Sequence, residues 1–302
     1  MSRLFKLLAH CPLGLLHTLG AAMGWVTYAL SPSYRRRLRV HTQAAGLSTW
    51  QRWSAVASAG RMVAELPRIW GRPRDQPLGQ RVRWTHPEVI DAVLSQGKGV
   101  VLLTPHIGCF EMVAQAYAER FGAVQPMTAL YRPSRQAWLG EIMVAARNRP
   151  GLNSAPATLS GVRQLLRALK NGQTLGLLPD QVPPEGMGVW APFFGQPAYT
   201  MTMAAKLAYQ TGAQLALVRC ERLGLWQRWT RGCDFILHAQ PASAELVAAV
   251  ASGDPAQSAA ALNHTMEAII MQCPQQYLWG YNRYKQPRAE ILTQGPAADP
   301  SK

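Results

Sequence analysis

The stretch GVVLLTPHIGCFEMVAQ, residues 99–115, begins as a continuous apolar run and ends in a helical pattern. A run such as VVLLT (100–104) is typical of a strand that helices cover on both faces. His106 follows this run, Gly108 permits a tight bend, and Glu111 falls in the first turn of the expected helix, where the helix dipole favours a carboxylate. The stretch predicts a strand–turn–helix unit with a histidine and a glutamate at its junction.

The same rhythm continues along the chain. Further strands are expected at 124–131, 174–180 (TLGLLPD) and 213–221 (AQLALVRCE), and helices at 109–122, 135–147, 159–172 and 200–212. This alternation predicts an α/β fold with a mostly parallel or mixed central sheet flanked by helices. PFFGQPAYT (192–200) is interpreted as a hydrophobic loop that enters a helix. No linker or repeat divides 41–288, so we expect one domain there and a flexible tail at 289–302.

The composition narrows the classes of partner. The chain has 302 residues, of which 48% are hydrophobic and 16% charged, and this argues against disorder. Lys and Arg outnumber Asp and Glu by 31 to 16, a net charge of +15 that favours nucleic acid, anionic lipid or an acidic protein as partner. The five scattered cysteines contain no C-x-x-C pair, so neither a zinc ribbon nor a disulfide framework is indicated.

Residues 1–40 are interpreted as a membrane anchor with a basic flank. No Asp, Glu, Lys or Arg occurs from Leu7 to Tyr34, and about 20 apolar residues suffice to cross a bilayer as a helix. A cleaved signal peptide and a buried amphipathic helix are the alternatives. The following RRRLR (35–39) outnumbers Arg3 and Lys6, which places the downstream domain in the cytoplasm if the helix is an anchor.

Ligands of open α/β sheets collect at the carboxyl ends of strands, where His106 and Asp180 are both expected. Across a strand–turn–helix junction Glu111 can fold back toward His106. The imidazole would then take a proton from a hydroxyl while the carboxylate fixes its tautomer. Cys109 is a candidate nucleophile only if it is exposed with a lowered pKa.

Other reaction types lack their motifs. The chain has no G-x-S-x-G and no H-E-x-x-H, so we expect no serine nucleophile, no metal and no cofactor. A general base without a nucleophile indicates direct transfer to a bound hydroxyl. The remaining histidines fit no pattern and are interpreted as structural: His10, His17, His41, His86, His238 and His264.

A histidine and an acid in H-x4-[DE] spacing after a buried strand resemble the glycerolipid-type acyltransferases. YRPSRQAWLGEIMVAARNRPG (131–151), LLPDQ (177–181), PFFGQPAYT and CPQQYLWGYNRYK (273–285) narrow this resemblance. Together they are similar to the lipid A biosynthesis acyltransferases, from the N-terminal segment to about residue 288.

This resemblance implies an inner-membrane enzyme whose catalytic domain faces the cytoplasm. It would transfer an acyl chain from acyl carrier protein to a hydroxyl of a lipid A precursor. His106 and Glu111 fall on the family's catalytic dyad, and Arg147 and Asp180 on positions linked to its active site. The basic excess fits an acidic carrier protein and a phosphorylated glycolipid. The chain departs from the family pattern in having Cys109-Phe110 for Asn-Trp, and Tyr281 for a histidine.

Several further residues are candidates for substrate binding. Arg132, Arg147 and Arg149 could bind phosphate or form a solvated basic face, and Asp180 and Gln181 could bind substrate or cap a turn. Phe193 and Phe194 could line an acyl tunnel or belong to the loop. Two other functions stay open: acyl transfer to a glycerophosphate, lysophospholipid or other glycolipid, and a non-catalytic basic module on a membrane. Nucleic acid is not expected, because no recognition motif for it is present.

Overall fold

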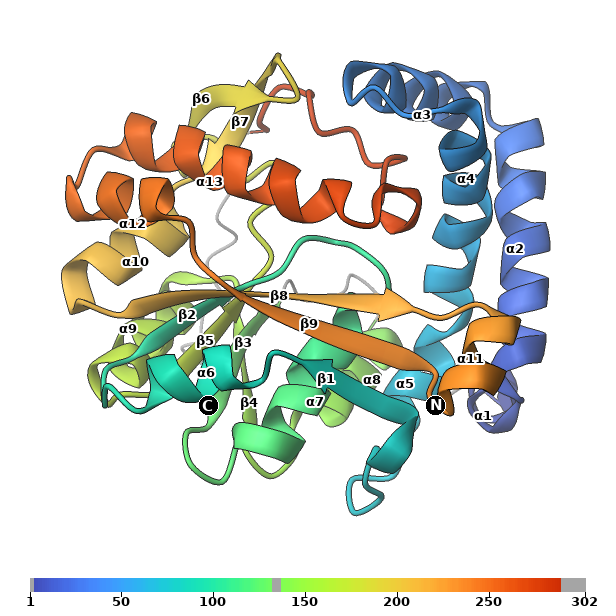
Figure 1. Cartoon of the computed structure of the whole chain (residues 1–302), viewed down its shortest axis with the longest axis horizontal. Helices are drawn as coiled ribbons and strands as arrows, with labels where there is room; N and C mark the ends of the chain where they lie inside the picture. The colour runs from blue at the N-terminus through green and yellow to red at the C-terminus, as the bar shows by residue number, and fades with distance from the viewer. Residues whose placement is uncertain (1–2, 132–136, 289–302) are drawn as a thin grey trace, which may run out of the picture.

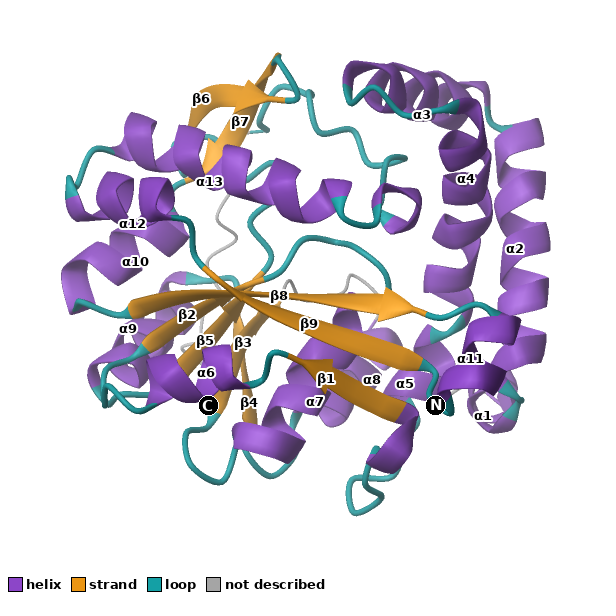
Figure 2. Ribbon diagram, viewed as in Figure 1, coloured by secondary structure: helices purple, strands orange, loops and turns teal. Residues whose placement is uncertain are grey.

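The computed structural model describes residues 3–131 and 137–288, and a seven-stranded sheet lies at its centre (Figures 1 and 2). The strand order is β1-β9-β8-β2-β5-β3-β4, and every neighbouring pair is parallel except β8 and β9. The strands are β1 (Val82–Thr85), β2 (Val100–Leu103), β3 (Met127–Tyr131), β4 (Leu152–Pro156), β5 (Thr174–Leu177), β8 (Gln214–Arg222) and β9 (Phe235–Pro241).

Helices cover both faces of this sheet, which confirms the expected α/β class (Figure 2). They are α1 (Arg3–His10), α2 (Leu13–Leu30), α3 (Pro32–Ala44), α4 (Thr49–Ala64), α5 (Leu66–Trp70), α6 (Glu88–Leu94), α7 (Phe110–Phe121), α8 (Ala137–Arg147), α9 (Leu159–Lys170), α10 (Met203–Thr211), α11 (Leu225–Arg231), α12 (Ala244–Ala251) and α13 (Pro255–Met271), with short 3₁₀ turns η1 (Gly79–Arg81) and η2 (Pro274–Gln276).

The segment 192–200 differs from its expectation as a loop. It contributes to an antiparallel hairpin of β6 (Gly188–Phe193) and β7 (Gln196–Met201). The two turn residues, Phe194 and Gly195, have φ angles of 46° and 71°. Two consecutive residues with positive φ make the tight turn whose twist matches a hairpin, and this turn is usually written Asn-Gly rather than Phe-Gly.

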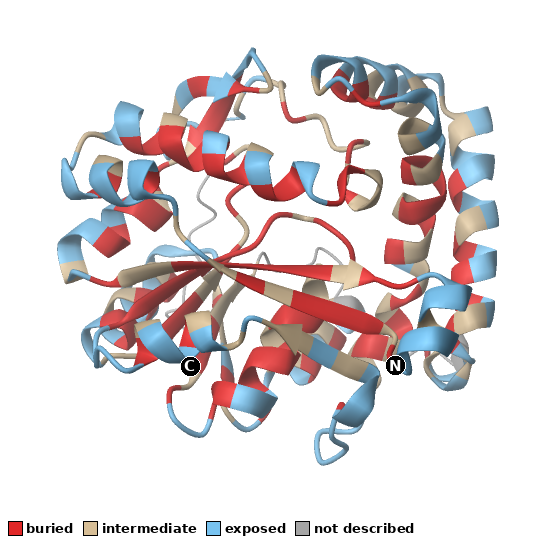
Figure 3. Cartoon of the chain, in the orientation of Figure 1, coloured by how far each residue is buried: buried red, intermediate tan, exposed pale blue. Residues whose placement is uncertain are grey.

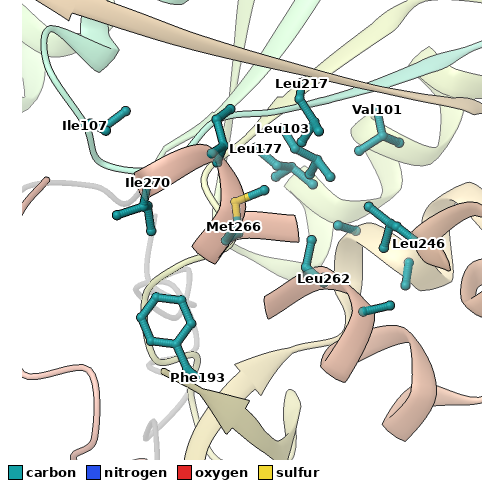
Figure 4. Close-up of a cluster of buried hydrophobic side chains, with 14 of the residues drawn as sticks. Val101, Leu103, Ile107, Leu177, Phe193, Leu217, Leu246, Leu262, Met266 and Ile270 are labelled. Atoms are coloured by element: carbon teal, nitrogen blue, oxygen red, sulfur yellow. The ribbon is translucent and has the colours of Figure 1, made fainter. Parts of the chain in front are cut away.

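The hydrophobic core lies on both faces of the sheet, and β2 contributes side chains to the core on each face. Val101 and Leu103 belong to one cluster of buried side chains, and Val100 and Leu102 to the other. Successive residues of a strand point to opposite faces, so a strand covered on both sides must be apolar at every position. Figure 4 shows the first cluster, where Met266 of α13 lies near side chains of the sheet.

The N-terminal helices pack against the side of this core (Figure 1). By length and composition, α2 is the one helix of the described chain long and apolar enough to cross a membrane. It also packs along α4 through glycines: a Cβ on Gly24 would lie 2.3 Å from the Val56 carbonyl oxygen. Its face toward α4 is buried and its opposite face is exposed (Figure 3).

Two expected boundaries concern the chain's ends. The boundary placed at residue 40 falls inside α3, which continues to Ala44. The expected tail at 289–302 lies outside the described residues.

Candidate active site

His106 and Asp180 meet because β2 and β5 are adjacent and parallel. Leu103 of β2 is in register with Leu177 of β5, and each polar residue follows its leucine by three positions. Because the two strands are parallel, residues three positions beyond a paired Leu103 and Leu177 lie side by side. The His106 Nδ1 atom lies 2.7 Å from Asp180 Oδ1, and the backbone N–H of His106 donates to Oδ2 at 2.9 Å.

The Asp180 carboxylate is buried, with 2% of its surface exposed. Burial by itself raises the pKa of Asp180, but the charge of His106 and the hydrogen bonds that His106 donates lower it overall. Burial and the neighbouring Asp180 together raise the pKa of the fully buried Tyr277 well above its ordinary value. Asp180 is therefore an anion that accepts hydrogen bonds.

An ionised Asp180 fixes the tautomer of His106. The proton must lie on Nδ1, which donates to the carboxylate, so Nε2 keeps its lone pair. The side-chain amide of Gln181 donates to this Nε2 at 3.1 Å. A substrate hydroxyl that replaced this amide would find a ready proton acceptor. The ring of Phe110 lies against the imidazole, with the ring centroids 4.8 Å apart.

Glu111 has different partners from those expected. Its Oε1 accepts from Arg147 Nη2 at 2.5 Å, and its Oε2 accepts from the Trp70 indole N–H at 3.0 Å. Among the described residues no hydrogen bond joins it to His106. The role of fixing the His106 tautomer therefore belongs to Asp180. Since Glu111 is the second residue of α7, its side chain reaches α5 and α8 rather than the preceding turn.

Arg147, the last residue of α8, has one guanidinium nitrogen without a partner. Its Nη1 is buried and forms no hydrogen bond with any described residue. The guanidinium also lies 6.0 Å from the centre of the Tyr131 ring. A buried unpaired donor is costly, and an anionic group placed there would satisfy it. Arg132, another arginine of this segment with a predicted binding role, lies outside the described residues.

Cys109 does not meet the conditions for a nucleophile. Its side chain is buried, and burial together with its hydrogen bond to Cys220 raises the pKa of the thiol well above the ordinary value. A thiol of this kind is inert because the thiolate is the reactive form. Two of the three residues that depart from the family pattern therefore have structural contacts: Cys109 fills the core, and Phe110 packs against the His106 ring.

Arg149, which the sequence analysis considered for substrate binding, contacts the backbone of its own neighbourhood in the structure. Its three guanidinium nitrogens donate to the backbone carbonyls of Ala146, Pro73 and Arg72. Burial and the nearby arginines lower its pKa to about 10. The guanidinium holds the chain after α5 against the end of α8, and each of its three nitrogens has a backbone partner.

The two phenylalanines of the expected acyl tunnel pack into the hairpin and its surroundings. Phe193 is 1% exposed and lines a cavity of about 10 Å³, which is roughly the space of one water molecule and too small for an acyl chain. Phe194 packs on Trp279, with ring centroids 5.4 Å apart. Arg283 stacks on Phe193 and donates to the Tyr199 carbonyl, so this region is a packed core.

Three residues of the site were not singled out as site residues from the sequence. Trp70 binds Glu111, Tyr277 adjoins Asp180, and the Tyr281 hydroxyl accepts from the Val182 N–H just beyond Asp180. Only Tyr281 had a signal, as a departure from the family pattern. In the described part of the chain no group of three or more His, Cys, Asp or Glu side chains could hold a metal ion.

Comparison with known proteins shows the family of this chain. Residues 53–286 match the family model of the bacterial lipid A biosynthesis acyltransferases. The chain is 27% identical to the lipid A biosynthesis palmitoleoyltransferase of Escherichia coli (strain K12), over 76% of this chain and 69% of that protein, and the lauroyltransferase of the same strain matches at the same identity and coverage. The phosphatidylinositol mannoside acyltransferase of Mycobacterium tuberculosis (strain ATCC 25618 / H37Rv) is 28% identical over 53% of this chain and 50% of its own length.

The family match covers far more than half of the chain and includes His106, Glu111, Arg147 and Asp180. It also includes β2 and β5, whose carboxyl ends form the site. This chain is an acyltransferase and belongs to the bacterial lipid A biosynthesis acyltransferase family.

Proposed function

We propose that this protein transfers a fatty acyl chain from acyl carrier protein to a hydroxyl of a lipid A precursor, at the cytoplasmic face of the inner membrane. The observation that carries the proposal is the His106–Asp180 couple, which leaves Nε2 unprotonated at the carboxyl ends of the central strands. The family membership and the named activities of the relatives support the acceptor class. The donor thioester is a substrate, and the reaction proposed needs no cofactor.

In the proposed step the acceptor hydroxyl replaces the Gln181 amide at His106 Nε2. As its oxygen attacks the thioester carbonyl, the C–O bond forms, the proton moves to Nε2, and the C–S bond then breaks. The imidazolium returns the proton to the departing thiolate. Asp180 acts as a positioning group that stabilises the imidazolium, as a buried carboxylate does in other base couples.

Glu111 and Arg147 act together in this proposal. The carboxylate holds one side of the guanidinium, and the unpaired Nη1 is left for an anionic group of the acceptor. Arginine suits a phosphate because its planar donors match two phosphate oxygens. Glu111 thus keeps its place in the active site, as the residue that orients Arg147.

A second acceptor is another glycolipid. The likeness to the mycobacterial phosphatidylinositol mannoside acyltransferase favours it, since that protein is named for a different sugar-bearing lipid. Both acceptors present a sugar hydroxyl, and the His106–Asp180 couple suits either.

Mass spectrometry of membrane lipids from cells with and without the gene tests the proposal. Loss of one acyl chain from lipid A would support it, whereas a change confined to other lipids would favour the second acceptor. His106→Ala must reproduce the loss while the protein stays folded. Full transfer activity in that variant would exclude the base.

A further inference from the structure

A pocket lined largely by polar residues lies between α2, α4, α11 and the turn at Gln275 and Gln276. Its volume is about 260 Å³, and none of the residues assigned to the His106 or Glu111 sites lines it. Three arginines line it, Arg61, Arg222 and Arg228, together with hydroxyl groups of α2 and α4. Such a cluster of guanidinium groups needs negative charge nearby.

The Glu65 carboxylate, which lies within the cluster, already accepts hydrogen bonds at both oxygens. Arg222 donates to both oxygens of Glu65, at 2.7 and 2.5 Å, and a further donor of Arg222 reaches the Gly108 carbonyl at 2.8 Å. Arg228 donates to Nδ1 of His17, and its ion pair with Asp234 is long, at 3.9 Å. One tightly held carboxylate therefore serves several cationic groups.

Arg61 is the side chain left over. It forms no hydrogen bond and no ion pair with any described residue. Burial, together with the positive charges of Arg222 and Arg228, lowers the pKa of Arg61. An anion in the pocket would relieve this repulsion and would accept hydrogen bonds from the unused N–H groups of Arg61.

The rim of the pocket is apolar. Trp50 and Leu225, which line it, are 67% and 71% exposed, and the neighbouring Trp226 and Trp229 of α11 are 72% and 77% exposed. Exposed apolar surface of this kind marks an interaction site, and tryptophan is enriched where a membrane meets water. A ligand that fits both rim and floor is an amphiphile with an anionic headgroup.

The exposed face of α2 continues the rim. Gly14 of α2 lies against Leu225 of α11, so the two helices adjoin. Along α2 the exposed apolar side chains recur at helical spacing: Leu15, Leu19, Met23, Val26 and Leu30. The opposite face packs on α4 (Figures 1 and 3).

The packing of α2 on α4 limits the orientation that α2 can take relative to a bilayer. His17 on its buried face binds the Glu65 carboxylate at 2.8 Å, inside the arginine cluster. A helix tied in this way to charged residues suits the plane of the interface better than the hydrocarbon centre. The apolar stripe would then enter the lipid while the pocket faces the headgroups.

We propose that the pocket between α2, α4 and α11 binds the phosphate group of an anionic membrane lipid, while Trp50, Leu225 and the exposed face of α2 lie in the bilayer interface. The inference shares with the proposed function only the location at a membrane. Binding can be measured without any acyl transfer.

The experiment is co-sedimentation of the full chain with two kinds of phosphatidylcholine vesicle. One kind contains phosphatidic acid, and the other contains oleate in the amount that gives the same negative charge. The wild type should bind the phosphatidic acid vesicles more tightly. Arg61→Ala should weaken that binding roughly tenfold, the size of one lost charge-assisted hydrogen bond, and should leave binding to the oleate vesicles nearly unchanged. Trp50→Ala should weaken binding to both.

Matched controls lie away from the pocket. Arg167 is exposed on α9, on the other side of the molecule from α2 in Figure 1, and Trp190 on β6 is 46% exposed. Arg167→Ala and Trp190→Ala should bind vesicles as the wild type does. Equal losses for Arg61→Ala and Arg167→Ala would show only general surface charge and would overturn the proposal.

Two other ligands would also overturn it. If Arg61→Ala abolishes binding of inorganic phosphate but not of vesicles, the pocket is a site for soluble phosphate. If it raises the KM for acyl carrier protein with vesicle binding unchanged, the surface docks a protein. If the wild type and its variants bind vesicles as predicted but the wild type transfers no acyl group, the proposed function is refuted and the proposed lipid site is still supported.

Discussion

His106 and Asp180 lie 2.7 Å apart because each follows a registered leucine by three residues, Leu103 and Leu177, on neighbouring parallel strands. The buried carboxylate determines which imidazole nitrogen carries the proton and which is free. The catalytic proposal can therefore be tested at a residue that does not touch the reacting atoms.

Asp180→Asn should lower kcat by about 10³–10⁴-fold, because an amide can donate to Nδ1 and so favour the wrong tautomer. The measurement is steady-state transfer from acyl carrier protein, with circular dichroism to verify folding. The pH profile is the second readout, because a change limited to stability would not shift it. An unchanged kcat in Asp180→Asn would show that the couple has no part in transfer.

Arg147→Lys should raise KM for a phosphorylated acceptor about tenfold and change KM much less for an acceptor without the phosphate. A lysine cannot offer the two planar donors that a phosphate accepts. Glu111→Gln should produce the same pattern, since it releases the guanidinium that Glu111 holds. If both variants lower kcat equally for both acceptors, Glu111 and Arg147 act on the chemical step instead.

Cys109→Ala should keep nearly full activity and lose stability by about 1–2 kcal/mol, because a buried side chain is shortened. The thiol is buried and its pKa is raised, so treatment of the wild type with iodoacetamide should also leave transfer unchanged. Loss of transfer in a folded Cys109→Ala protein would reinstate the thiol as a nucleophile.

Gly24→Ala should destabilise the protein by several kcal/mol, because the new Cβ would meet the Val56 carbonyl oxygen at 2.3 Å and force α2 from α4. Gly14→Ala, in the same helix, is the matched control, since its nearest neighbour is a Leu225 methyl group at 3.7 Å. Urea unfolding in detergent measures both. Similar stabilities for the two variants would contradict the close packing of α2 on α4.

Unfolding free energy should fall as the pH drops below about 6.5. Burial lowers the pKa of His17 from 6.5. Below pH 6.5 the unfolded chain therefore binds a proton that the folded chain does not, and this proton uptake favours unfolding. Above pH 6.5 His17 is neutral in both states, so the loss of stability is absent there. One histidine contributes a slope of at most about 1.4 kcal/mol per pH unit. Burial lowers the pKa of His41 as well, with the same sign.

His17→Gln should reduce this slope whatever it does to the stability at pH 8. His264→Gln, at an exposed position on α13, is the control and should leave the slope as it is. Denaturant titrations at several pH values between 5 and 8 give the comparison. A slope unaffected by His17→Gln would mean that another group titrates.

The apolar runs VVLLT and TLGLL determined the buried strands and with them the fold class, because a strand covered on both faces must be apolar at every position. Their alternation with helices placed His106 and Asp180 at strand ends, and the resemblance supplied the activity. The hairpin at 188–201 escaped prediction because its turn uses Phe194 where Asn is usual.

Only the tertiary structure decided which acid serves the histidine. By spacing along the chain Glu111 was the expected partner of His106, yet strand register brings Asp180 to it from 74 positions away. In the same way, Arg149 is indistinguishable from Arg147 by residue type, but its donors go to backbone carbonyls while Arg147 keeps one free. Sequence spacing fixes local order, whereas the partner of a side chain depends on which distant strands and helices pack beside it.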